Sequence, residues 1–257
     1  MQFFDANCFL GQPPSPVLRS FNTAAELLEE MDDIGIERAV VCHAAAQMPG
    51  SDGNRRLMNE VRNRKRLLPC WIVHPQFFNG RREISECLSE FRGEGIRMVR
   101  LQPGPLNRYS LHPWAFGEFF DGLASADIAL YVEILVRHGF DHSGIPEHEW
   151  PILHEMAGRH PALNIILFGK KLSVSKAQLF GLMRARKNVC VDTSAFQTWR
   201  ATEILCENIG ADRLVFGSYM PHFDAAQFVT QVQYAAISEE DRKKIASGNL
   251  SKKLGMT

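Results

Sequence analysis

Short apolar runs recur along this chain at nearly even spacing, and each is followed by a polar loop and an amphipathic stretch. The runs have the length of buried strands. They cover Phe3–Asn7, Arg38–His43, Leu68–His74, Ile96–Gln102, Ile128–Leu135, Leu163–Phe168, Val189–Ser194 and Arg213–Ser218. Their starts lie roughly 25 to 35 residues apart, the length of a strand with its crossover helix. Eight such units predict a (β/α)8 TIM barrel, and 257 residues is a usual size for one.

The segments between these runs carry helix signals. Thr23 is expected to cap a helix, with Glu26 as its capping-box partner and Gly35 at the helix end. The alternative is an open doubly wound sheet, but its usual Gly-x-Gly-x-x-Gly loop is missing after the first apolar run. No linker rich in Pro, Gly or Ser divides the chain, so we expect one domain over residues 1–257.

Composition excludes several classes of protein. The 29 basic residues balance the 29 acidic ones, which argues against a nucleic-acid partner. The sequence has no apolar run of membrane-spanning length, and its first residues do not resemble a signal peptide. The six cysteines form no Cys-x-x-Cys pair and are expected to be free thiols of a cytoplasmic protein.

In a TIM barrel the chemistry gathers at the carboxyl ends of the strands. This rule selects a small set of candidate residues. His74, His43 and Asp192 are the candidates for moving a proton, and Asn7, Arg100, Gln102, Glu133, Tyr219, His222 and Lys170 are the candidates for binding a substrate. Because side chains alternate along a strand, Glu133 shares a face with Leu135 and Tyr131, and Arg100 shares one with Gln102 and Met98. If these faces point into the barrel, both charges lie inside it. We therefore expect them to form an ion pair, since an unpaired buried charge is costly.

Four segments together resemble the amidohydrolase superfamily, specifically its amidohydrolase-2 branch of hydrolases, lactonases and decarboxylases. They are FFDANCFLG from Phe3, NVCVDTSA from Asn188, GADRLVFGSYMP from Gly210 and SGNLSKKLG from Ser247. They resemble the branch's first, seventh and eighth strands and its C-terminal element, in the right order. The resemblance implies a TIM barrel and, by analogy, a homodimer.

The same resemblance implies a divalent metal, but its ligand positions are substituted here. Asn7 and Phe9 stand at the His-x-His positions, Leu135 and Phe168 at the histidines of strands five and six, and Tyr219 at the final Asp. A divalent site needs several converging N, O or S donors, which these residues do not supply. We therefore expect no cofactor.

Three functions remain open. The first is a metal-independent hydrolase, lactonase or decarboxylase in which Arg100, with Lys170, holds a small anionic substrate. The second is a catalytically inactive barrel that binds a ligand or partner, with Phe9, Phe168 and Leu135 filling the former metal cavity. The third is an enzyme that recruits a metal elsewhere through His43, His74, Glu133 and His222.

Overall fold

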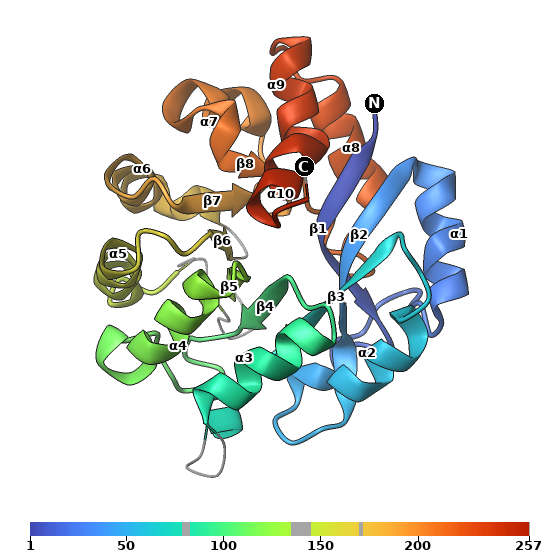
Figure 1. Ribbon diagram of the computed structural model, residues 1–257. Coiled ribbons are helices and arrows are strands. Elements are labelled where there is room, and N and C mark those ends of the chain that lie inside the picture. Colours follow the sequence, from blue (N-terminus) through green and yellow to red (C-terminus); the bar gives the residue numbers. More distant parts are fainter. Residues whose placement is uncertain (79–82, 135–144, 170–171, 257) are drawn as a thin grey trace.

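A computed structural model of the chain describes residues 1–78, 83–134, 145–169 and 172–256. Eight parallel strands follow one another in chain order around a (β/α)8 TIM barrel, with helices outside them (Figure 1). The strands are β1 Phe3–Leu10, β2 Ile36–His43, β3 Leu67–Ile72, β4 Met98–Leu101, β5 Ala129–Glu133, β6 Ile165–Phe168, β7 Val189–Asp192 and β8 Leu214–Val215. The predicted fold and all eight predicted strands are confirmed, with shifts of a few residues at their ends.

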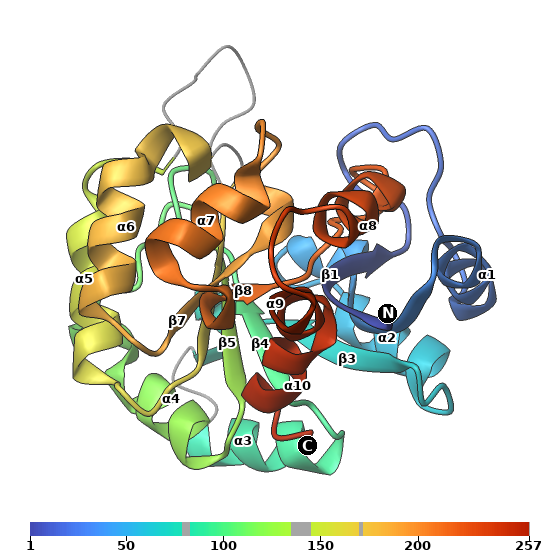
Figure 2. The same ribbon diagram turned by 90° about the horizontal axis from the view of Figure 1, so that it is seen from above.

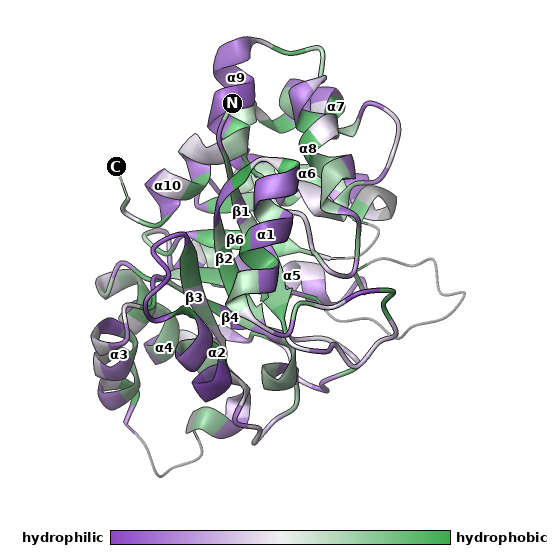
Figure 3. Ribbon diagram, turned by 90° about the vertical axis from the view of Figure 1, so that its right-hand side faces the viewer, coloured by the Kyte–Doolittle hydropathy of each residue, from purple (hydrophilic) through white to green (hydrophobic). Residues whose placement is uncertain are grey.

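The helices alternate with the strands, as the amphipathic segments predict. They are α1 Ala24–Ile34, α2 Gly53–Val61, α3 Ile84–Gly93, α4 Pro113–Ser125, α5 Glu149–Arg159, α6 Lys176–Ala185, α7 Ala201–Ile209, α8 Ala225–Gln233, α9 Glu239–Lys243 and α10 Asn249–Lys253. Short turns precede several of them, among which η1 Ala44–Gln47 and η4 Thr193–Ala195 border the site. In Figure 3 the outer helix α2 is largely hydrophilic and the neighbouring strand β3 is hydrophobic.

The barrel closes between β1 and the segment that continues β8. The backbone N–H of Ala6 donates to Phe216, that of Phe9 donates to Met220, and that of Tyr219 donates to Asn7. This closure brings the first strand and the residues that follow the last strand together at one mouth of the barrel. It is the reason that residues about 200 positions apart can form one site.

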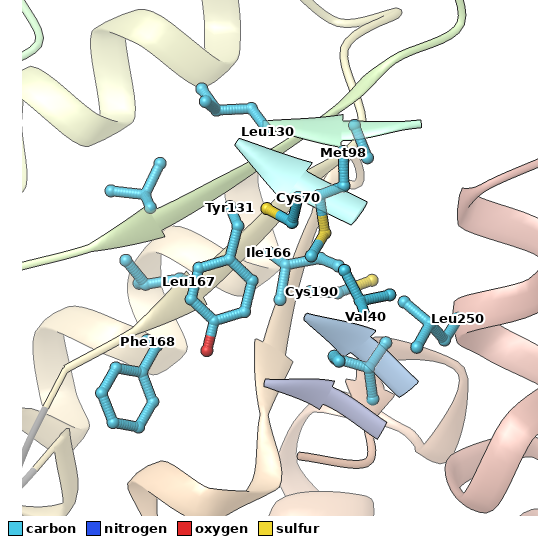
Figure 4. Close-up of a cluster of buried hydrophobic side chains, with 14 of the residues drawn as sticks. Val40, Cys70, Met98, Leu130, Tyr131, Ile166, Leu167, Phe168, Cys190 and Leu250 are labelled. Atoms are coloured by element: carbon cyan, nitrogen blue, oxygen red, sulfur yellow. The ribbon is translucent and has the colours of Figure 1, made fainter. Parts of the chain in front are cut away.

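The last helix covers the opposite end of the barrel. Asn249 donates to the carbonyl of Leu214, and Arg97 donates to that of Leu254, so α10 is tied to residues where strands begin. Figure 2 shows α9 and α10 beside β8 and β1. Leu250 enters the core with the strand side chains in Figure 4. With the amino ends of the strands covered in this way, the carboxyl ends are the place for a site.

Candidate functional site

An ion pair between β4 and β5 lies at the centre of the carboxyl ends of the strands. Nη1 of Arg100 donates to Oε2 of Glu133 over 3.2 Å, and both side chains are 1% exposed. Nη2 of Arg100 donates to Oδ1 of Asn7 over 2.7 Å. The pairing predicted from strand alternation is confirmed. Without Glu133, the buried guanidinium would carry an uncompensated desolvation cost.

Glu133 also accepts hydrogen bonds from two more predicted site residues. Nε2 of Gln102 donates to Oε2 over 2.7 Å, and the Tyr219 hydroxyl donates to Oε1 over 2.9 Å. Burial raises the pKa of Tyr219 well above its usual value, and the nearby charge of Glu133 raises it further. Tyr219 therefore stays neutral and acts as a donor. It brings the loop after β8 into contact with β5.

Asp192, at the end of β7, is the centre of a second group of hydrogen bonds. Its Oδ2 accepts from Nδ2 of Asn7 over 3.0 Å and from the Tyr131 hydroxyl over 2.5 Å, while Oδ1 accepts twice from Ser194. Burial raises the pKa of Asp192, and these hydrogen bonds oppose the shift. Because Asn7 donates to Asp192 and accepts from Arg100, it joins the two groups into one network.

Tyr131 and Ser194 belong to this network although they are not among the predicted site residues. Tyr131 lies two positions before Glu133 on β5, so strand alternation places it on the same inward face and could have identified it. Ser194 lies in η4, immediately after β7, and no local pattern marks its hydroxyl as a partner of Asp192. Its contact depends on the turn that the chain makes there.

Aromatic rings occupy three of the five positions that correspond to metal ligands in the family that this sequence resembles: Phe9, Phe168 and Tyr219. The ring centroids of Phe9 and Tyr219 are 5.9 Å apart, and those of Phe168 and Tyr219 are 4.7 Å apart. Figure 4 shows Phe168 beside Tyr131 within the core. Across the described residues, no three His, Cys, Asp or Glu side chains are arranged to hold a metal ion. Among the residues that the structure describes, the donor atoms at this mouth do not fit a divalent metal.

His43, at the end of β2, and His74, two residues after β3, both form hydrogen bonds with the backbone of η1. Nδ1 of His43 accepts from the N–H of Ala45 over 3.1 Å, so the proton of the neutral ring lies on Nε2. Nε2 of His74 lies 2.8 Å from the carbonyl oxygen of Ala46 and must donate, because a carbonyl only accepts. Burial lowers the pKa of His43, and Arg56 lowers it further. In the part of the chain that the structure describes, Nε2 of His43 and Nδ1 of His74 accept or donate no further hydrogen bond, so each is left for other chemistry.

The remaining predicted residues take different places. His222 stacks on Tyr219, with centroids 4.5 Å apart and an interplanar angle of 19°. His74 lines a cavity of about 320 Å³ between the segments that follow β2 and β3, together with Trp71 and Phe77. Lys170 and Leu135 lie outside the described residues. The structure does not gather His43, His74, Glu133 and His222 into the alternative metal site within its described parts.

The family model described as amidohydrolase matches residues 9–250. No curated protein sequence matches the chain significantly. Across the described ranges 1–78, 83–134, 145–169 and 172–256, no helix has the length and apolar character needed to cross a membrane.

Several solved structures share the architecture. A 2,6-dihydroxybenzoate decarboxylase in complex with 2,6-dihydroxybenzoate has a TM-score of 0.76 and 17% identity, covering 99% of this chain and 100% of the other. A 5-carboxyvanillate decarboxylase from Novosphingobium aromaticivorans with bound manganese has a TM-score of 0.75 and 14% identity, covering 98% and 97%.

A third similar structure is a putative 2-pyrone-4,6-dicarboxylic acid hydrolase from Pseudomonas putida. It has a TM-score of 0.73 and 16% identity, covering 99% of this chain and 97% of the other. At such identities these structures support the fold alone. The family model, in contrast, spans nearly the whole sequence, from β1 to α10. This chain therefore belongs to the amidohydrolase family.

Proposed function

We propose that this chain hydrolyses, opens or decarboxylates a small anionic substrate without a divalent metal. Membership of the amidohydrolase family supports the reaction class. The compounds named for the similar structures, 2,6-dihydroxybenzoate, 5-carboxyvanillate and 2-pyrone-4,6-dicarboxylic acid, are aromatic or ring-containing carboxylic acids, which supports the substrate class.

The observation that carries this proposal is the buried Arg100 network at the carboxyl ends of the strands. A substrate carboxylate would compete with Oε2 of Glu133 or with Oδ1 of Asn7 for the guanidinium, since each forms only one hydrogen bond with it. Charge-assisted bonds of this kind are roughly twice as strong as neutral ones. Tyr219 and Asn7 would then orient the bound acid.

The proton would be moved by Asp192 or by the free ring nitrogen of His43 or His74. Asp192 is the candidate closest to the Arg100 network, because Asn7 contacts both residues. Its raised pKa brings it nearer to neutral pH, as general acid–base chemistry requires. His43 offers Nε2 as a donor, and His74 offers Nδ1 as an acceptor.

A second candidate function is a non-catalytic barrel that binds a ligand or partner. Two observations favour it. Arg100, Glu133, Asn7 and Asp192 already have hydrogen-bond partners and are at most 1% exposed, and the rings of Phe9, Phe168 and Tyr219 pack where a metal would be held. The cavity beside His74 is large enough for a small molecule.

Turnover measured in a chelator-containing buffer separates the two. A panel of dihydroxybenzoates, methoxylated aromatic acids and pyrone carboxylates is followed by ultraviolet absorbance and by carbon dioxide release. We expect turnover of at least one acid, and an Asp192→Asn variant should lower kcat by about 10²- to 10⁴-fold. His154→Gln, which changes an exposed histidine of α5, is the matched control and should leave kcat unchanged.

A different result of the turnover experiment would favour the ligand-binding function. If no acid of the panel is turned over while one of them raises the melting temperature, the ligand-binding function replaces the enzymatic one.

We also keep the expectations of a homodimer, a cytoplasmic location and no nucleic-acid partner. Light scattering of the purified chain tests the first of these.

A further inference from the structure

The guanidinium of Arg100 lies against the positions that correspond to metal ligands in the family. It only donates hydrogen bonds and carries a permanent charge. It donates to Asn7 over 2.7 Å, and its central carbon lies 4.7 Å from the centroid of the Phe9 ring. It reaches Tyr219 through Glu133, which accepts from both residues. Arg100 thus touches two of these positions and is bridged to a third.

The electrostatics of the mouth favour one resident cation. Glu133 neutralises Arg100, and Asp192 accepts four hydrogen bonds from neutral donors. A divalent ion placed beside the guanidinium would meet a like charge in a water-poor environment, where such repulsion is strong. It would also have to take Glu133 away from Arg100 and so leave the arginine unpaired.

The shape of the mouth favours a flat cation over a spherical one. The Arg100 guanidinium lies 4.1 Å from the centroid of Tyr131 and 4.7 Å from that of Phe9, within the range of cation–π attraction. The oxygens of Glu133 and Asn7 accept from its two terminal nitrogens. Aromatic faces with acceptors at the edge match a planar guanidinium, whereas a metal needs donor atoms in the places where these rings stand.

We propose that the Arg100 side chain replaces the divalent metal as the resident cation of this barrel mouth, so that the chain contains a guanidinium-binding cavity instead of a metal site. This inference rests on the metal independence in the proposed function. It adds the identity of the replacing group and predicts that the cavity selects a free guanidinium ion when the arginine is shortened.

The first measurement uses the unchanged protein. After purification without chelator, metal analysis by mass spectrometry should find much less than one divalent ion per chain. Calorimetric titration with Mn²⁺ and Zn²⁺ should show no stoichiometric binding, and neither ion should raise the melting temperature. One tightly bound ion per chain, displaced by a chelator with a fall in melting temperature, would overturn the inference.

The second measurement is chemical rescue of an Arg100→Ala variant. Millimolar guanidinium or methylguanidinium chloride should raise its melting temperature in a saturable way, and equal concentrations of ammonium chloride, Mn²⁺ or Zn²⁺ should not. Arg100→Met fills the same space and should show no rescue. Arg55→Ala, which removes an exposed arginine, is the second control. Rescue of Arg100→Ala by a metal, or equal rescue of all three variants, contradicts the proposal.

These measurements also separate this inference from the proposed function. Guanidinium rescue in a protein that turns over none of the acids would keep the cation assignment and reject the enzymatic function. Turnover that appears only after a divalent metal is added would keep the reaction class but reject both the cation assignment and the metal independence of the proposed function. If Arg100→Ala does not fold, the metal titration of the unchanged protein still tests whether the barrel mouth binds a divalent metal.

Discussion

At the scale of single residues, buried carboxyl groups dominate the chemistry of this barrel. Asp5 lies in β1 at 0% exposure, accepts from the backbone N–H groups of Asn7 and Ser218, and pairs with the Ser218 hydroxyl. Burial raises its pKa from 3.8 to about 7, although the Ser218 and Asn7 hydrogen bonds oppose the shift. Folding therefore favours the protonated form of Asp5.

We predict that the free energy of unfolding falls less with rising pH in an Asp5→Asn variant than in the wild type. Above pH 3.8 the unfolded carboxyl is ionised while the folded one keeps its proton, so this group lowers stability progressively until the pH reaches about 7. Between pH 5 and pH 7 the wild type should lose about 2 kcal/mol relative to the variant, at about 1.4 kcal/mol per pKa unit. Urea unfolding across this range measures the difference.

The control for this prediction is Asp33→Asn, which changes an exposed carboxyl of α1. Its stability should follow that of the wild type at every pH. A constant difference between Asp5→Asn and the wild type from pH 5 to pH 7 would show that Asp5 is ionised in the folded protein.

At the scale of elements, the ends of helix α1 show which features can be read from neighbours in sequence. The predicted cap of α1 is confirmed, because the Thr23 hydroxyl accepts from the N–H of Glu26 and Gly35 ends the helix with φ of 79°. The capping box is modified, since the Glu26 carboxylate accepts from the N–H of Asn22 instead of that of Thr23. Such local signals depend on neighbours in sequence and are therefore readable from it.

The segment after β8 must pass close to β7, and a glycine permits this. A Cβ at Gly217 would overlap the carboxylate of Asp192. We predict that Gly217→Ala lowers the free energy of unfolding by about 1–3 kcal/mol, the usual cost of overpacking. It should also disturb the Tyr131–Asp192 hydrogen bond, which near-ultraviolet difference spectroscopy of the tyrosine would detect.

Gly181→Ala is the matched control for this glycine. Gly181 lies in α6, and a Cβ added there would meet open space. The substitution should stabilise the protein by about 0.5–1 kcal/mol, because glycine is unfavourable within a helix. Equal effects of the two substitutions on the free energy of unfolding would show that the close approach of Gly217 to Asp192 does not exclude a Cβ atom.

At the scale of the whole molecule, the continuous core encloses nearly all thiols. Cys8, Cys42, Cys70, Cys87 and Cys190 are buried, and Cys206 is partly exposed. Burial, together with the nearby charge of Asp241, raises the pKa of Cys206 to about 11. The expectation of free cysteines is confirmed for all six.

We predict that the native protein reacts slowly, at one thiol, with an aromatic disulfide reagent at pH 8. The five buried thiols should react only as fast as the protein unfolds, because the thiolate is the reactive form and needs access to solvent. Cys206→Ser should remove the single native reaction and leave the other five. Fast reaction of several thiols without denaturant would mean that the barrel opens locally.

Much of this architecture could be predicted from the sequence. The alternation of short apolar runs with amphipathic stretches determined the eight strands, because parallel strands covered on both faces must be apolar throughout. Alternation within strands also showed that Glu133 shares a face with Leu135 and Arg100 one with Gln102. The cost of a buried charge then predicted that Arg100 and Glu133 pair if these faces point inward, as they do. The substituted metal-ligand positions were likewise visible in the sequence.

Only the tertiary structure decided how these residues are used. Asn7 and Asp192 are 185 positions apart, and their contact exists because β1 closes the barrel. His43 ends β2, as predicted, whereas β3 ends at Ile72 and His74 follows it by two residues. Both histidines bond to η1, because the chain turns there and exposes the backbone groups of Ala45 and Ala46. Periodicity and propensity describe neighbours in sequence, whereas hydrogen bonds across a barrel mouth depend on which strand ends meet in space.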